Sequence, residues 1–157
     1  MEPILNEEQT LMRETAVKLT RDFGGPKRAR EIRNDRKELD VPAWMEVLRS
    51  GWLSAAVPDS ADGMGMGVFE LTLALEEAGR QLLMVPLAEC AVAAHVLSQC
   101  GTQGEMQVRA ILQGLQIMIP ALPQEGWGNE GSELPVARFE NNQWLLDRKS
   151  TRLNSSH

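Results

Sequence analysis

The sequence predicts a mainly α-helical fold: a bundle of helices, followed by the first strands of a β-domain. Apolar residues recur at steps of three and four through most of residues 6–114, and glycines or prolines separate these stretches. After residue 114 the pattern changes to short apolar runs that are typical of strands. We therefore expect a helical domain over residues 1–114, the start of a truncated β-domain over 115–146, and a tail of different origin over 147–157.

The first two helices are predicted from their ends. Asn6 is a good N-cap and Gln9 stands three residues later, which is the spacing of a capping box. The run Gly24-Gly25-Pro26 then ends the first helix. A second, shorter helix opens at Asp40 with Pro42 in its first turn and stops at Gly51.

Three further helices are predicted over Val68–Leu83, Leu87–Cys100 and Glu105–Gln113. The basic run Lys27–Lys37 is expected to be a solvated connector or a short polar helix, and contact with an anionic ligand tail or a neighbouring subunit is the alternative. Before the third helix, Ser54–Pro58 is expected to be a buried extended connector. It leads into a glycine-rich loop that lacks the Lys-Ser/Thr step of a phosphate-binding Walker loop.

Strands are predicted towards the end of the chain. Leu115–Leu122 is a short apolar run between a glycine and a proline, and Val136–Glu140 and Trp144–Leu146 flank the turn residues Asn141-Asn142. A hairpin of this size does not bury a core alone, so these strands are expected to belong to something larger.

The tail Asp147–His157 reads DRKSTRLNSSH, which is the translation of a common sequencing-library adapter. We expect it to be non-native, and we exclude it from the fold. The reading frame would then be cut rather than finished.

Composition excludes several classes of function. The net charge of −6 argues against nucleic acid as the main partner, because phosphate binding needs a basic face. No apolar run is long enough to span a membrane, and no histidine cluster or CxxC pair indicates a metal site. Cys90 and Cys100 are placed on one helix, too far apart for a disulfide, and are expected to be buried thiols in a reducing, cytoplasmic compartment.

No catalytic group of residues can be assembled from the sequence. His95 is expected to be a hydrogen-bonded packing residue within an apolar helix. Glu76 and Glu77 are adjacent on a helix, so their side chains point about 100° apart and at least one of them is expected to be solvated.

The order of several short motifs is more informative than any one of them. They are Gly51-Trp52, Val57-Pro58-Asp59, Gly63-Met64-Gly65 and Leu75-Glu76-Glu77-Ala78-Gly79-Arg80. In this order and spacing the chain resembles the N-terminal part of an acyl-CoA dehydrogenase over roughly residues 4–146. The Gly-Arg…Val-Pro-Leu variant is similar to bacterial members that degrade steroids and other bulky acyl-CoA thioesters.

The resemblance implies an N-terminal helical domain, a middle β-barrel and a C-terminal four-helix bundle. It implies FAD as cofactor, an acyl-CoA thioester as substrate, a trans-2-enoyl-CoA product and an electron-transfer flavoprotein or similar acceptor. It also implies a homo- or hetero-oligomer. The family's base, a Glu, comes from the C-terminal domain, so no catalytic residue is expected in this chain and the chain alone is expected to be inactive.

Two sets of site residues follow from the resemblance. Ala121, Leu122 and Pro123 align with the strand that lies against the flavin, but the family's Thr-Glu pair is replaced by Pro123-Gln124, and weak or absent FAD binding is expected here. Leu87, Cys90 and Ala91 align with a helix that lines the acyl channel; plain interhelical packing is the alternative. Two other functions stay open, namely a non-catalytic partner subunit of a heteromeric dehydrogenase and a stand-alone helical interaction module.

Overall fold

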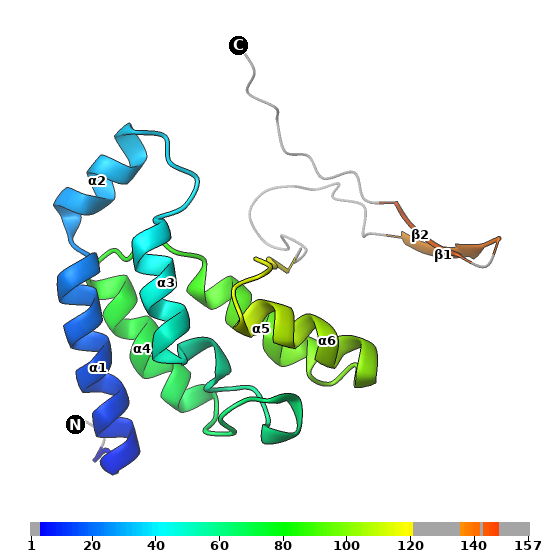
Figure 1. The fold of residues 1–157 in the computed structure, drawn as a ribbon, viewed down its shortest axis with the longest axis horizontal. Coiled ribbons are helices and arrows are strands. Elements are labelled where there is room, and N and C mark those ends of the chain that lie inside the picture. The colour runs from blue at the N-terminus through cyan, green and yellow to red at the C-terminus, as the bar shows by residue number, and fades with distance from the viewer. Residues whose placement is uncertain (1–3, 121–135, 142, 148–157) are drawn as a thin grey trace, which may run out of the picture. The chain divides into compact units, whose positions relative to one another are not determined.

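The structure is a computed structural model, and it describes residues 4–120, 136–141 and 143–147. The chain divides into two compact units, Met1–Pro120 and Ala121–His157, which are described separately (Figure 1). The described part of the first unit contains the helices α1 (Glu7–Phe23), α2 (Pro26–Asn34), α3 (Val41–Ser50), α4 (Val68–Arg80), α5 (Leu87–Leu97) and α6 (Gly101–Leu112).

Helices α1 and α4 lie side by side and run in the same direction (Figure 1). At their first turns the Gln9 amide donates a hydrogen bond to Glu70, with Nε2 and Oε1 2.8 Å apart. At their last turns the backbone N–H of Gly25 donates to the carbonyl of Gln81 at 2.5 Å. Two neighbouring helices that run in the same direction need a connection that returns the chain to the starting end. Here α2, α3 and the segment after them form that connection.

The predicted ends of α1 and α3 are confirmed. Asn6 accepts a hydrogen bond from the backbone of Gln9 at 2.8 Å, and the Gln9 side chain accepts one from the backbone of Asn6 at 3.0 Å, completing a capping box. Asp40 caps α3 by accepting from the Ala43 N–H at 3.4 Å. Gly51 then ends α3 in the left-handed conformation, with φ of 75°.

One apolar core lies inside the first unit. Every helix except α2 contributes buried side chains to it, together with the turn after α3. Its members include Met12, Ala16, Trp44, Val47, Trp52, Leu53, Leu71, Ala74, Cys90, Ala94, Val108 and Ile111. The predicted helical bundle is therefore confirmed.

Three helix ends differ clearly from the prediction, the first being the start of α6, which lies at Gly101 and not at Glu105. Helix α4 stops at Arg80 because Leu82 adopts a left-handed φ of 51° and the Leu83 N–H returns to the carbonyl of Ala78. Helix α5 ends at Leu97, so Cys100 lies outside it, at the start of α6. Both cysteines are free, as predicted, but Cys100 is exposed, so the expectation of two buried thiols on one helix was wrong.

The connector after α3 is buried but not extended. A 3-10 turn, η1 (Trp52–Ser54), continues through the buried residues Ala55–Val57 as further turns, and a second 3-10 turn, η2 (Asp59–Ala61), follows. Because the segment folds into repeated turns, several of its side chains pack between α3 and α5. An extended strand of the same length would place fewer side chains there. The basic run forms the polar helix α2, one of the two forms predicted for it.

In the second unit, β1 (Val136–Glu140) and β2 (Gln143–Asp147) form an antiparallel hairpin in which Phe139 pairs with Trp144. The predicted hairpin is therefore confirmed, and it reaches Asp147, the first residue of the expected tail. The predicted strand Leu115–Leu122 differs, because residues 116–120 pair with no strand in the described part of the chain. Residues 121 and 122 lie outside the described residues.

Candidate functional site

The glycine-rich loop folds back onto the buried turn after α3. Four successive N–H groups of the loop donate to carbonyls of this turn, so the loop and the turn form one hydrogen-bonded unit. The bonds join Met64 to Ser54 (2.9 Å), Gly65 to Val57 (2.9 Å), Met66 to Ala55 (3.0 Å) and Gly67 to Ala55 (3.1 Å). These N–H groups are already used within the protein, so they are not free to hold a phosphate.

The close approach of Gly63 to Val57 shows why the loop has a glycine at this position. A Cβ placed on Gly63 would overlap the backbone carbonyl of Val57 and would lie 2.6 Å from the Val57 Cβ. The two segments approach this closely only because one of them has no side chain. The loop motif therefore serves packing in this part of the molecule.

The three residues predicted to line the acyl channel all face inwards. Leu87, Cys90 and Ala91 are 2%, 0% and 1% exposed, and they pack within the helical core. The opposite face of α5 carries Val92 and Val96, which are 43% and 55% exposed. The sequence placed Leu87, Cys90 and Ala91 on one face of this helix, as channel lining or as interhelical packing, and in the helical unit that face packs towards α6 and η1.

The environment of Cys90 is that of a packing residue. Burial raises the pKa of the Cys90 thiol, while a hydrogen bond from the backbone of Met118 acts in the opposite direction. A thiol kept protonated inside a core is a poor nucleophile. The contact also shows that the segment following α6 runs beside Cys90.

His95 is a hydrogen-bonded packing residue, as predicted. Its Nδ1 lies 2.8 Å from the carbonyl oxygen of Ala56, in the buried turn after α3. Its Nε2 lies 3.3 Å from the side-chain nitrogen of Gln99, one turn later on α5. Both nitrogens of this half-buried ring are therefore occupied.

The two adjacent glutamates of α4 do not form a catalytic pair. Glu76 and Glu77 both pair with Arg80, at 2.6 Å and 3.4 Å. The Glu76 side chain is 62% exposed, which confirms that at least one of the two is solvated, while Glu77 is 13% exposed. The two carboxylates therefore share one arginine partner on the helix surface and do not face a common reacting group.

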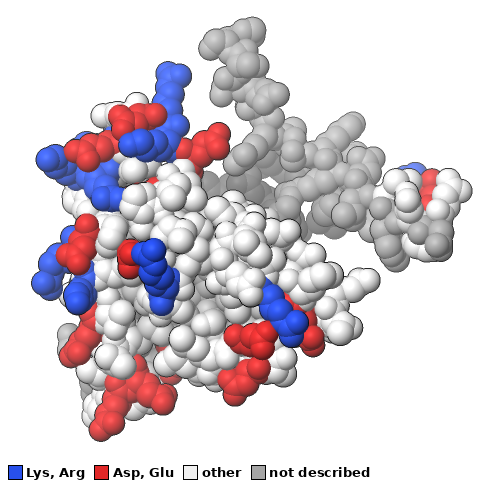
Figure 2. Space-filling view, in the orientation of Figure 1, with Lys and Arg blue, Asp and Glu red and all other residues white. Residues whose placement is uncertain are grey.

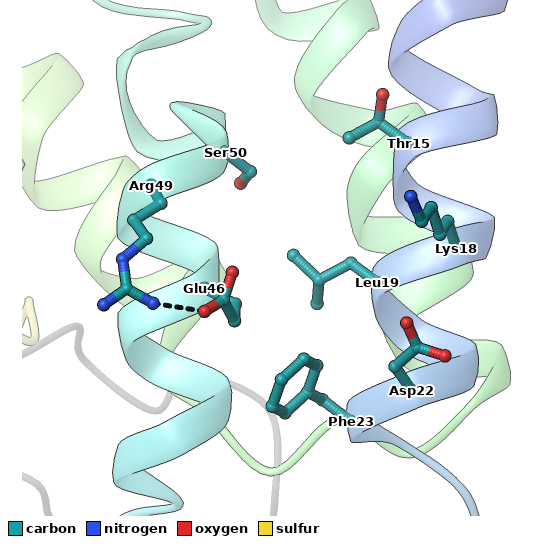
Figure 3. A pocket seen from close by; sticks show the side chains of 8 residues that line it. All are labelled: Thr15, Lys18, Leu19, Asp22, Phe23, Glu46, Arg49 and Ser50. Atoms are coloured by element: carbon teal, nitrogen blue, oxygen red, sulfur yellow. Dashed lines mark hydrogen bonds and ion pairs between the residues drawn. The ribbon is translucent and has the colours of Figure 1, made fainter.

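A shallow groove of about 270 Å³ lies between the antiparallel helices α1 and α3 (Figure 3). Leu19 and Phe23 give it apolar walls, and Glu46 and Arg49 form an ion pair on its α3 side (Figure 3). Its lining residues are Thr15, Lys18, Leu19, Asp22, Phe23, Glu46, Arg49 and Ser50. None of them is a predicted site residue, and the set includes no histidine or cysteine.

An ion pair between the half-buried Arg28 and the buried Asp40 joins α2 to the start of α3. Arg28 donates from Nε and Nη2 to the two carboxylate oxygens of Asp40, at 2.5 Å and 2.7 Å, and its guanidinium lies 5.5 Å from the centre of the Phe23 ring. The Arg28 hydrogen bonds hold the pKa of Asp40 below its ordinary value, although burial acts against them. Figure 2 shows acidic and basic side chains mixed on the viewed face of α2, not a continuous basic surface.

Other predicted features are only partly covered by the described residues. Within residues 4–120, 136–141 and 143–147, no group of three His, Cys, Asp or Glu side chains is arranged to hold a metal ion. In the same residues no helix combines the length and apolarity needed to cross a bilayer. The predicted flavin contacts Ala121, Leu122 and Pro123 lie outside the described residues.

Comparison with known proteins supplies the family. The family described as "Acyl-CoA dehydrogenase, N-terminal domain" matches residues 6–115, which is most of the chain. The chain belongs to the acyl-CoA dehydrogenase family. The match coincides with the helical unit and covers the glycine-rich loop and the LEEAGR motif, so the resemblance stated from these residues is confirmed.

Curated relatives agree with this assignment. The chain is 32% identical over 100 residues to the acyl-CoA dehydrogenase FadE27 of Mycobacterium tuberculosis, covering 56% of this chain and 27% of FadE27. It is 23% identical over 149 residues to FadE12 of the same species, covering 91% of this chain and 38% of FadE12. The chain therefore spans well under half the length of the curated relatives it matches.

Two solved structures share the fold. A variant of the Tcur3481–Tcur3483 steroid ACAD aligns with a TM-score of 0.77 and 27% identity, covering 89% of this chain and 39% of that one. The ChsE4–ChsE5 complex from Mycobacterium tuberculosis aligns with a TM-score of 0.74 and 24% identity, covering 93% and 40%.

Proposed function

We propose that this chain is the N-terminal part of a subunit of an FAD-dependent acyl-CoA dehydrogenase, which converts an acyl-CoA thioester to the trans-2-enoyl-CoA. The family match over residues 6–115 carries the proposal. As the chain spans 27% to 40% of its relatives, the acidic base and most of the flavin site would come from residues that follow it. This chain alone would be inactive. Its two free thiols suit a reducing compartment such as the cytoplasm.

The three expected flavin contacts do not by themselves fit a flavin. Ala121 and Leu122 offer only backbone groups, and Pro123 has neither a backbone N–H nor a side-chain donor. We therefore assign no step of the reaction to these residues. Weak or absent FAD binding by the chain alone is part of the proposal.

A non-catalytic partner subunit is the second candidate function. The two aligned structures, the Tcur3481–Tcur3483 steroid ACAD and the ChsE4–ChsE5 complex, are each named for two proteins together. With the substitution at Pro123, this favours a heteromer whose substrate is a bulky polycyclic acyl-CoA. A stand-alone helical interaction module has less support, because the hairpin does not enclose a core of its own.

The test is to resequence the source DNA through codon 146 and onward, and then to express the protein that this frame encodes, alone and with candidate partner subunits. Absorbance near the flavin band gives the FAD bound per chain, and a dye-coupled assay with acyl-CoA gives the activity. Flavin and activity in the complete protein alone would support the catalytic subunit. Flavin only in a heteromer would support the partner subunit, and neither in any combination would contradict both.

We also propose that α5 forms one wall of the acyl channel. Since Leu87, Cys90 and Ala91 are buried, they would act by holding α5 in place, and Ala88 and Val92 on the outer face would be the ones to meet an acyl group. Val92→Phe in the complete enzyme should then lower activity on bulky substrates more than on short ones. Ala91→Phe should shift the preference only through a displaced helix, and an unchanged preference in both variants would contradict the channel.

A further inference from the structure

The buried turn after α3 has its carbonyls satisfied from two directions. The glycine-rich loop donates to the carbonyls of Ser54, Ala55 and Val57. The carbonyl of Ala56 points the other way and receives its hydrogen bond from the His95 ring at 2.8 Å. Ala56 is 7% exposed, so without His95 this carbonyl would lose its side-chain partner in a buried position.

This geometry fixes the tautomer of His95. A carbonyl oxygen can only accept, so Nδ1 must carry the proton. In the neutral ring Nε2 is then an acceptor, and the Gln99 amide, 3.3 Å away, is placed to donate to it. The ring is therefore held from both sides, by the turn and by its own helix.

We infer that His95 is a positioning residue that locks α5 onto the turn and its glycine-rich loop. The lock fixes the rotation of α5 about its axis, which keeps Cys90 and Ala91 inside and turns Val92 outwards. The role of α5 as a channel wall rests on the proposed function; the lock itself does not. Packing of α5 on α6 and η1 buries one side of a helix that is nearly all small or apolar, and the His95 bond adds a directional contact to that packing.

The first test is the ring nitrogen spectrum of the 157-residue chain. A His157→Ala background leaves His95 as its single histidine. Nitrogen-15 NMR at neutral pH should show protonated Nδ1 and unprotonated Nε2, the reverse of the form that a free histidine side chain favours in water. A predominant Nε2–H form would overturn the inference.

The second test is amide hydrogen exchange in His95 variants. In His95→Leu the amides of Met64–Gly67 and of α5 should exchange about tenfold faster or more, since a buried carbonyl loses its donor. Amides of α1 should change much less. His95→Asn should restore most of the protection, because its amide nitrogen stands as many bonds from Cα as Nδ1 does.

These readouts separate a lock from general destabilisation. A uniform loss of protection across α1 and α5, or a failure of His95→Asn to rescue, would contradict the inference. If His95→Leu does not fold, the Asn variant and the tautomer of the unsubstituted ring still decide it. None of these measurements requires flavin or substrate, so their failure is distinguishable from failure of the proposed function.

Discussion

The helical unit and the β-hairpin differ in where their apolar side chains lie. In the helical unit Trp52 and Leu53 are 0% and 2% exposed. In the hairpin Leu145 is 51% exposed. Two paired strands have only marginal stability without a further surface to pack on, whereas five helices and the turn after α3 already pack around one core. The helical unit therefore buries apolar side chains within itself, while the described hairpin leaves Phe139 and Leu145 exposed.

The largest expected effect on stability comes from replacing a buried leucine of the helical unit by alanine. Leu53→Ala should lower the free energy of unfolding by about 2 to 5 kcal/mol, because it opens a cavity in the core. Leu145→Ala is the matched control, and it should change that free energy by about 0.5 kcal/mol or less. Urea unfolding followed by circular dichroism measures both. Equal losses would mean that the hairpin carries a core as the helical unit does.

The close contact of the glycine-rich loop with the turn gives the next largest effect. Gly63→Ala should destabilise the helical unit by about 1 to 3 kcal/mol, because the added methyl overlaps the carbonyl of Val57. Thermal and urea unfolding of the purified variant measure the loss. A neutral Gly63→Ala would contradict the packing explanation of the motif.

Removal of the ion pair between α2 and α3 should have a pH-dependent effect. Arg28→Ala should cost on the order of 1 to 2 kcal/mol at neutral pH, since the buried Asp40 carboxylate loses its donor. The pKa of Asp40 in the folded protein lies below its ordinary value of 3.8. The stabilisation is therefore fully present above that value and is lost as the pH falls through the folded pKa.

Stability curves of the parent and of Arg28→Ala should accordingly converge in acid. The control is Lys27→Ala, which removes an exposed pair with Glu31 at 4.0 Å and should change stability little at any pH. A difference between parent and Arg28→Ala that stays constant down to the acid limit would assign the effect to the Phe23 contact instead of the ion pair.

The smallest expected effect is a gain. Gly79 lies within α4, and a Cβ there would meet no atom within 4 Å. Gly79→Ala should therefore stabilise the helical unit by about 0.5 to 1 kcal/mol, through the better helix propensity of alanine. The same unfolding experiment measures it. A decrease in the free energy of unfolding would contradict this expectation, because it would mean that the added methyl group of Gly79→Ala meets a neighbour.

Local signals predicted most of the helical unit. Asn6 with Gln9 and Asp40 with Gly51 mark helix ends through hydrogen bonds that the chain makes within a few residues. Such contacts depend little on the rest of the fold, so sequence patterns locate them well. The hairpin around Asn141 was predictable for the same reason.

The remaining features depend on contacts between distant segments. Which face of α5 is buried follows from its packing on η1 and α6, so a helix that is apolar nearly all round left packing and channel lining open for Leu87, Cys90 and Ala91. The early end of α4 rests on Leu82 in a conformation that favours glycine, so no residue type announces it. The His95 bond to Ala56 joins residues far apart in the sequence.

Amide hydrogen exchange of the whole chain tests most directly whether the helical unit is stable by itself while the hairpin needs a further surface to pack on. We predict that core amides of α5 and α6 exchange only through global unfolding, while the paired amides of β1 and β2 exchange at close to unprotected rates. Protection of the hairpin equal to that of the helices would contradict this account, because the hairpin would then be stable without any further part of a β-domain.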